Sequence, residues 1–235
     1  MGVRQFELGV AVTLRLQSRS GRVEVVAEPR EDVEAEGEQV EALVDDGGAA
    51  LRIRNGHGSK PLLVRCPVGT DVAVGTQSGA VRMVGEFGAI SVTTMSGRIE
   101  VDAADEADLR SVSANITIGT CRGRCRMRTS NGTATAGHVG ALSAGTVSGS
   151  IKADRVDGAI KARSVSGSIE AASCGDGAIT VKTISGKVHI ELPKGVEPHT
   201  RFKSFSGRVH CECPEGSDLL IEAMTVSGAI EVVPT

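Results

Sequence analysis

A serine followed by glycine is the feature of this sequence that most resembles a catalytic residue. The pair recurs in phrases such as "SVSGSIEA" (164–171) and "TVSGAIEV" (225–232). A hydrolase nucleophile sits in G-x-S-x-G at a strand-to-helix turn and needs a base beside it, and none of these serines has that spacing. Neither a phosphate loop nor a dinucleotide fingerprint occurs. We therefore expect a structural role for the Ser-Gly pair, no catalytic residue, no enzymatic activity and no cofactor.

Histidines and cysteines are the residues that could bind a metal. His189 and His210 follow successive Ser-Gly phrases at the same distance, so stacking in sequence order would place their rings about 5 Å apart. A catalytic zinc takes three protein ligands, so these two are weak candidates and no metal site is expected. Cys211 and Cys213 share a strand face with Val209, which favours small core residues over metal or disulfide chemistry.

The densest basic segment is "CRGRCRMR" (121–128), where arginines alternate with Cys121, Cys125 and Met127 on the opposite face of a strand. The arginines are Arg122, Arg124, Arg126 and Arg128. This face is a candidate site for an anionic partner. The alternative is a solvated face whose arginines pair with acids on neighbouring strands.

Composition and charge argue against several function classes. The 235 residues carry a net charge of -3, four Phe and no Trp or Tyr. The chain thus lacks an overall basic footprint for nucleic acid and the aromatic platforms on which single strands stack. The N-terminal segment is interrupted by charge, and no stretch approaches the roughly 18 apolar residues of a membrane span. We expect a cytoplasmic protein with no nucleic-acid partner and no membrane insertion.

An internal repeat organises most of the chain. Counted from the serine of each phrase, copies recur every 17 to 21 residues, and Ser20 marks an outlying copy upstream. The nine regular anchors are Ser78, Ser96, Ser113, Ser130, Ser148, Ser166, Ser185, Ser206 and Ser227. Residues three and five places after each anchor are mostly apolar, and the residue four places after is mostly polar, as a half-buried strand requires.

The residue one place before each anchor is also mostly apolar and is predicted to form a third inward column. These residues are Gln77, Met95, Val112, Thr129, Val147, Val165, Ile184, Phe205 and Val226. A unit of about 18 residues cannot bury its apolar face alone, so stacked units are expected.

The predicted fold is an all-β, single-stranded β-solenoid whose coils (one turn of the solenoid each) contain two short strands. Residues 1–75 are less regular and are predicted to form irregular β coils and a cap, and residues 76–235 the regular repeats. The acidic run from Glu28 to Glu41 is predicted to be a solvated loop or an edge.

The stretch "PVGTDVAVGTQSGAVRMVGEFGAISVTTMSGRIEV" (67–101) carries a family resemblance. Its Pro-x-Gly-Thr-Asp lead-in at 67–71, followed by serial SG-x-[VI]-x-[VI] units, resembles the bacterial DUF4097 family of candidate adhesins. The resemblance implies a β-solenoid, no established enzymatic activity, and an adhesive or scaffolding role.

Three functions follow as hypotheses. The first is an interaction module that binds a protein partner, or a second copy, along a flat face. The second is a β-helical enzyme acting on polysaccharide through outward acids such as Glu100, Glu170 and Glu231. The third is self-assembly through an open C-terminal rung, "TVSGAIEVVPT" (225–235).

Overall fold

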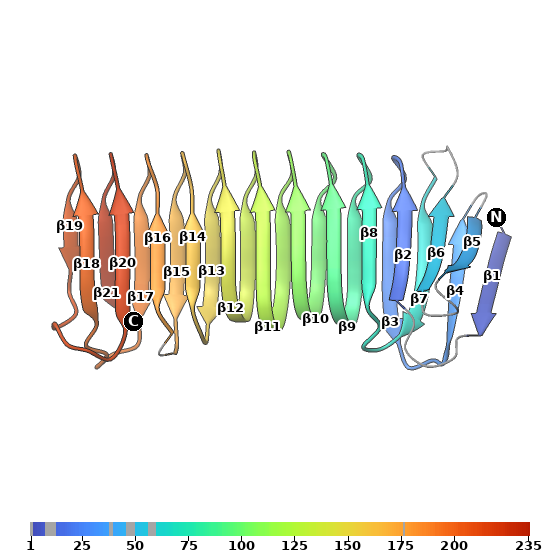
Figure 1. Cartoon of the computed structure of the whole chain (residues 1–235), viewed down its shortest axis with the longest axis horizontal. Helices are drawn as coiled ribbons and strands as arrows, with labels where there is room; N and C mark the ends of the chain where they lie inside the picture. The colour runs from blue at the N-terminus through green and yellow to red at the C-terminus, as the bar shows by residue number, and fades with distance from the viewer. Residues whose placement is uncertain (1, 8–12, 38–39, 46–49, 56–59, 176) are drawn as a thin grey trace. The chain divides into compact units, whose positions relative to one another are not determined.

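The computed structural model describes residues 2–7, 13–37, 40–45, 50–55, 60–175 and 177–235 (Figure 1). The chain divides into two compact units, Met1–Gly119 (unit 1) and Thr120–Thr235 (unit 2), and each is described by itself. Every regular element of the described residues is a β-strand, and most strand pairs are parallel and in register. The predicted all-β solenoid is confirmed, whereas the predicted boundary near residue 75 stays a prediction.

Unit 1 contains ten complete strands and the start of an eleventh. They are β1 (Gly2–Glu7), β2 (Thr13–Ser18), β3 (Val23–Glu28), β4 (Asp32–Gly37), β5 (Val40–Asp45), β6 (Ala50–Asn55), β7 (Leu62–Pro67), β8 (Val72–Thr76), β9 (Val81–Thr94), β10 (Ile99–Ser111) and β11 (Ile116–Thr129). Strands β9 to β11 run on through the bend of their coil for 13 or 14 residues, where two short strands were predicted.

The stacking order in unit 1 departs from the sequence order. Strand β2 pairs with both β6 and β8, and β3 pairs with both β7 and β9 (Figure 1). The coil of residues 13–28 therefore lies between the coils of residues 50–67 and 72–94. Val23, three places after Ser20, is in register with Val81, three places after Ser78. The outlying Ser20 copy is thus a regular rung.

The antiparallel strands of unit 1 include the acidic run. Strand β4 pairs with β1 and with β7, and it buries Val33 and Ala35. The prediction of a solvated loop or edge for the run from Glu28 to Glu41 is wrong for β4, since its alternating acids leave one apolar face that packs inward.

Unit 2 contains the rest of β11 and ten further strands. They are β12 (Ala134–Thr146), β13 (Ile151–Val156), β14 (Ile160–Arg163), β15 (Ile169–Ser173), β16 (Ile179–Lys182), β17 (Val188–Leu192), β18 (His199–Ser204), β19 (Val209–Cys211), β20 (Leu220–Thr225) and β21 (Ile230–Pro234). From β13 onward each coil has two short strands, as predicted.

The last coil of unit 2 is inserted into the stack. Strand β20 pairs with β16 and β18, and β21 pairs with β17 and β19 (Figure 1). The coil of residues 220–234 thus separates two coils that precede it in the chain. The prediction of an open C-terminal rung is wrong. Within the described residues, β18 and β19 are the strands of that stack that pair on one side only.

Two of the three predicted inward columns are correct. Residues such as Ile99 and Val101, or Ile169 and Ala171, are buried at the positions three and five places after the anchor. The column one place before the anchor is wrong, because its apolar members are largely exposed. These are Met95 (58%), Val112 (47%), Val147 (51%), Val165 (43%), Ile184 (52%), Phe205 (91%) and Val226 (50%).

A buried hydroxyl residue two places before the anchor explains this reversal. Thr76 and Thr94 are almost fully buried, and each Oγ1 accepts a hydrogen bond from the N–H of the glycine three residues later, at 3.1 and 3.0 Å. The hydroxyl side chain caps the bend from inside, as Ser and Thr commonly do at turns. Strand alternation then directs the next residue outward.

One rung is displaced by one residue from the predicted alignment. Thr129 is buried at the hydroxyl position, and Ala134 is in register with Ile151. The anchor of this rung is therefore Asn131, not Ser130. A shift of one residue moves every side chain to the other face, so Ala134 is buried where Thr133 was predicted.

The glycine of the Ser-Gly pair is required by the close approach of successive coils. A Cβ built on Gly167, whose φ is +154°, would lie 2.0 Å from the carbonyl oxygen of Gly149. Ser148 and Ser166 form parallel bridge partners, as do Ser166 and Ser185. Each Ser-Gly pair forms the bend of one coil, and the bends of successive coils stack on one another. This stacking explains why the pair recurs in the sequence.

Candidate interaction surface

The two histidines that were weak metal candidates do not occupy adjacent rungs. Glu231 lies between them, in register with His189 on one side and with His210 on the other. His189 Nδ1 is 3.1 Å from Glu231 Oε2, and His210 Nε2 is 3.1 Å from Glu212 Oε1. The predicted adjacency of the two rings is wrong because the C-terminal coil is inserted. Among the described residues, no group of three His, Cys, Asp or Glu side chains could hold a metal ion.

The cysteines differ in burial. Burial raises the pKa of Cys66 to about 11. The hydrogen bond with Cys121 is the main reason that the pKa of Cys125 is also raised, and burial adds to it. Cys211 and Cys213 are only partly buried and Val209 is 43% exposed, so their prediction as core residues is wrong. They belong to the coil that pairs on one side.

The arginines of "CRGRCRMR" all lie in unit 2, along β11. Arg122, Arg124 and Arg128 are exposed, Arg126 is partly buried, and Cys121, Cys125 and Met127 are in the core on the opposite side. The segment therefore alternates between exposed and buried side chains as a half-buried strand does, while its role as a site for an anionic partner stays a prediction.

Further cationic residues occupy the same sheet of unit 2. The sheet consists of the second half of β11 and β12 with β14, β16, β20 and β18, and we call its outward side the basic face. Its cationic residues are Arg124, Arg126, Arg128, Lys161, Arg163, Lys182, Arg201 and Lys203. On these strands, all of which the structure describes, Glu222 is the one outward acid, and it pairs with Arg201 at 3.6 Å.

Like charges are aligned across this ladder. Arg163 is in register with Lys182, so the two side chains start about 4.8 Å apart. Like charges directly opposite on neighbouring strands are destabilising. Both are exposed, and neither has an ion pair with any described residue. Arg163 and Lys182 therefore carry positive charge that no described acid neutralises, although the whole chain has a net charge of -3.

The other sheet of unit 2 neutralises its own charges. Lys152 pairs with Asp154 at 3.5 Å, and Arg155 pairs with Asp157 at 3.2 Å. Further along the same sheet, Lys187 lies 2.6 Å from Glu231. The two sheets expose different positions of the repeat. Charged residues at the positions exposed on this second sheet pair with one another, whereas Arg163 and Lys182 on the basic face do not.

Two carboxylates on this second sheet titrate below their ordinary range. The hydrogen bond with His138 (2.6 Å) is the main reason that the pKa of Asp157 is lowered, and Arg155 adds to it. The hydrogen bond from Lys187 is the main cause of the lowered pKa of Glu231. Asp157 is exposed and Glu231 is partly exposed, so these are local surface ion pairs.

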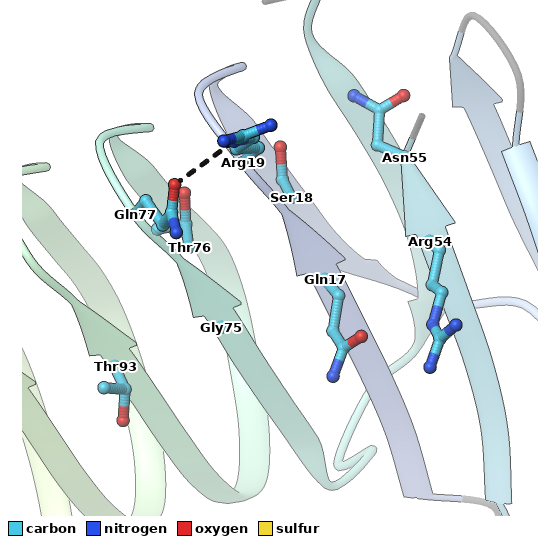
Figure 2. Close-up of a pocket in the computed structure, with 9 residues that line it drawn as sticks. All are labelled: Gln17, Ser18, Arg19, Arg54, Asn55, Gly75, Thr76, Gln77 and Thr93. Carbon is cyan, nitrogen blue, oxygen red and sulfur yellow. Dashed lines mark hydrogen bonds between the residues drawn. The ribbon is translucent and has the colours of Figure 1, made fainter. Parts of the chain in front are cut away.

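A polar groove of about 500 Å³ lies on the outward side of unit 1 (Figure 2). Gly75 lies in register between Gln17 and Thr93 and leaves open space where a side chain would stand. Arg19 and Arg54 supply two guanidinium groups at its rim, and Arg19 Nε lies 3.4 Å from Gln77 Oε1. The lining contains no carboxylate, so the groove suits a small polar or anionic group.

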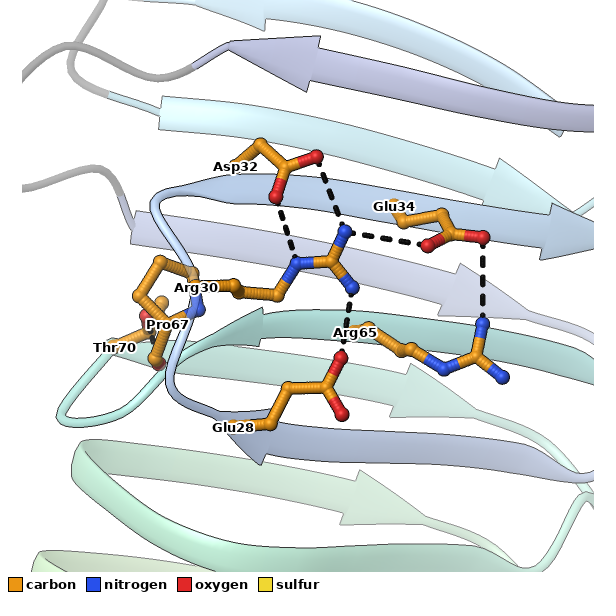
Figure 3. A network of polar contacts seen from close by, with 7 residues as sticks. All are labelled: Glu28, Arg30, Asp32, Glu34, Arg65, Pro67 and Thr70. Atoms are coloured by element: carbon orange, nitrogen blue, oxygen red, sulfur yellow. Dashed lines mark hydrogen bonds and ion pairs between the residues drawn. The ribbon is translucent and has the colours of Figure 1, made fainter.

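A second cluster in unit 1 is structural. Arg30, whose side chain is 13% exposed, contacts Asp32 at 2.8 Å, Glu28 at 2.9 Å and Glu34 at 3.2 Å (Figure 3). Arg65 reaches the other oxygen of Glu34 at 3.4 Å. Asp32 is the main cause of the raised pKa of Arg30, so the guanidinium stays charged. The cluster ties the connection between β3 and β4 to β7.

The comparisons agree with this architecture. The Toastrack DUF4097 family model matches residues 10–219. The chain belongs to this family. No curated protein sequence matches the chain.

Two solved structures match the chain over nearly its full length at low identity. A candidate cell adhesion protein from Clostridium sporogenes is 11% identical, with 100% of this chain and 98% of that chain covered and a TM-score of 0.28. A candidate adhesin from Bacteroides fragilis is also 11% identical, with 99% and 96% covered and a TM-score of 0.34. TM-scores this low support no argument about the function of this Toastrack protein. Within the described residues, no helix is long and apolar enough to cross a membrane.

Sequence reasoning missed most of the basic face of this Toastrack domain. Arg163, Lys182 and Lys203 are far apart in the chain and each looks like an ordinary surface charge. The signal is that all three occupy the position three places before their anchor serine. Reading that column of the repeat, rather than searching for runs of charge, would have brought them together.

Proposed function

We propose that this Toastrack protein is a non-enzymatic interaction module, adhesin-like or scaffolding, that binds an anionic partner along the basic face of unit 2. The observation that carries the proposal is the in-register pair of Arg163 and Lys182 on a sheet whose one outward acid is already paired. In the free protein this repulsion between Arg163 and Lys182 lowers the stability of the fold. An anionic partner reverses the sign of this interaction.

Retention on an immobilised polyanion tests this function. Heparin serves as the probe, and a salt gradient measures the strength of binding, since electrostatic contacts between exposed charges weaken with ionic strength. We expect the triple variant Arg163→Gln, Lys182→Gln and Lys203→Gln to elute at clearly lower salt than the unmodified protein.

The matched control carries the same change of net charge on the other sheet. It combines Lys152→Gln, Arg155→Gln and Lys187→Gln, whose side chains already pair with acids. The control should elute close to the unmodified protein. Equal elution of the two triple variants would mean that retention follows net charge, and the proposal would be abandoned.

A polysaccharide-degrading enzyme is the competing function. Its candidate acids are separated on the ladder: Glu100 pairs with Arg98 at 3.3 Å, and Glu170 is in register with Lys152 and His189. Glycosidases use two carboxyl groups flanking one bond. Loss of a measured glycan-cleaving activity in Glu170→Gln would reverse our preference.

A further inference from the structure

An exposed apolar ridge borders the basic face. It consists of the residues one place before the anchor serines in unit 2, which in stacking order are Val147, Val165, Ile184, Val226 and Phe205. The backbone links them directly, because the carbonyl oxygens of Val147, Val165 and Ile184 accept hydrogen bonds of 2.8 to 2.9 Å from the anchor N–H of the next rung. Four steps of about 4.8 Å make the ridge about 19 Å long.

The ridge is unusual for a surface. Its side chains are 43 to 91% exposed, and they are consecutive rather than scattered. Single exposed apolar residues are normal on proteins, whereas a contiguous row marks an interaction site. Met224, at the outward position next to Val226, adds a further exposed apolar side chain (38%).

Three cations lie beside the ridge on the same strands, Arg163 and Lys182 in register with each other and Lys203 separated from Lys182 by Met224 of the inserted coil. Arg163, Lys182 and Lys203 each precede a ridge residue by two positions, and the residue between them points inward. Positions two apart on a strand face the same side. An apolar line and a cationic line therefore lie in parallel on one surface, and we call Arg163, Lys182 and Lys203 the basic row.

The ridge and the basic row together favour one of three possible partners. A second copy placed ridge to ridge would bring basic rows toward each other, which like-charge repulsion opposes. A nucleic acid would use the cations but gains nothing from aliphatic side chains, since bases stack on aromatic rings. An anionic lipid bilayer uses both lines: headgroups attract the cations, and the apolar residues insert at the boundary with the acyl chains.

We propose that the ridge and the basic row form a peripheral docking surface for an anionic lipid bilayer. The proposal deepens the proposed function, on which it rests, because the basic row is part of the basic face. It requires no spanning segment: the protein lies on the membrane surface.

Vesicle sedimentation tests the proposal directly. Vesicles of phosphatidylcholine with about one third phosphatidylserine, compared with pure phosphatidylcholine, are the probes. We expect binding only to the anionic vesicles, falling as salt rises. Each basic residue near such a surface contributes about fivefold in affinity, so neutralising the three residues of the basic row is expected to weaken binding by about a hundredfold.

The ridge is tested by substitutions that keep the charge. The triple variant Val165→Ser, Ile184→Ser and Val226→Ser should lose binding to anionic vesicles by about tenfold while its thermal unfolding stays near that of the parent. Val68→Ser removes an exposed valine (51%) outside the ridge and should change nothing.

Insertion has its own readout because the chain contains no Trp. The fluorescence of Ile184→Trp should shift to shorter wavelength on anionic vesicles, and that of Ala172→Trp, on the other sheet, should not. Retention on heparin without vesicle binding would overturn the lipid inference and leave the proposed function standing. Absence of both would remove both, and a ridge-dependent dimer in light scattering would assign the ridge to a second copy.

Discussion

The inserted C-terminal coil makes a quantitative prediction that separates two stacking orders. Stacking in sequence order would place Val209 between Val188 and Ile230, buried on both sides. In the structure Val188 is in register with Ile230 and is fully buried, while Val209 is in register with Ile230 alone and is 43% exposed. The substitutions Val188→Ala and Val209→Ala therefore remove the same atoms from very different surroundings.

The magnitudes follow from burial. Val→Ala removes two carbon atoms, each contributing about 0.8 kcal/mol when buried, and a closed core adds the cost of a cavity. We expect Val188→Ala to lower the free energy of unfolding by about 2 to 3 kcal/mol. For Val209→Ala, partial exposure roughly halves the transfer contribution and leaves no closed cavity, so the loss is about 1 kcal/mol or less.

Urea denaturation followed by far-ultraviolet circular dichroism measures both values. Ile230→Ala, in the inserted coil itself, provides the third comparison, with an expected loss of about 3 to 4 kcal/mol. Equal losses for Val188→Ala and Val209→Ala would refute the inserted order and restore the simple stack.

Three further predictions concern single sites. Gly167→Ala should destabilise unit 2 by more than about 2 kcal/mol in thermal unfolding, because its Cβ would lie 2.0 Å from the Gly149 carbonyl oxygen, and an unchanged melting temperature would contradict that close approach. The lowered pKa of Asp157, caused first by His138, means that this carboxylate adds stability above its unfolded pKa near 3.8, and that the contribution is lost as the pH falls through the folded pKa. Asp157→Asn should therefore lower the urea midpoint more at pH 6 than at pH 2.5, and equal lowering at both would exclude this linkage. With a pKa of about 11, the Cys66 thiol should react with a disulfide reagent at pH 8 only after unfolding, unlike the exposed thiol of Cys174, and rapid native labelling would disprove its burial.

The period of the repeat was enough to predict a stacked all-β fold. Val and Ile at alternating positions after each anchor predict a half-buried strand. Because the anchors recur every 17 to 21 residues, one such strand is predicted for each coil. The order of the coils could not be predicted in the same way. Because the apolar columns of the coils are nearly equivalent, the pattern of apolar residues does not say which coil lies next to which.

The outward surface was predicted least well. Valine one place before the anchor fits a core column by type, and the hydroxyl residue before it, such as Thr94, is the residue that caps the bend from inside. The candidate docking surface depends on that reversal. The four arginines of β11 were visible as a run, but the basic row consists of single residues from separate coils: Arg163 and Lys182 become neighbours when coils stack, and Met224 lies between Lys182 and Lys203.

The inserted coil of residues 220–234 also constrains how the chain reaches this structure during synthesis. The coil containing β18 and β19 leaves the ribosome before the coil that must separate it from β16 and β17. If it paired at once with β17, Val209 would take the register against Val188 that Ile230 occupies in the native stack. The later coil would then have to displace it strand by strand, a slow exchange of the kind that non-local pairing imposes. We expect this exchange to be the rate-limiting step in the folding of unit 2. The strand displaced from β17 would be β19, which is only half-buried.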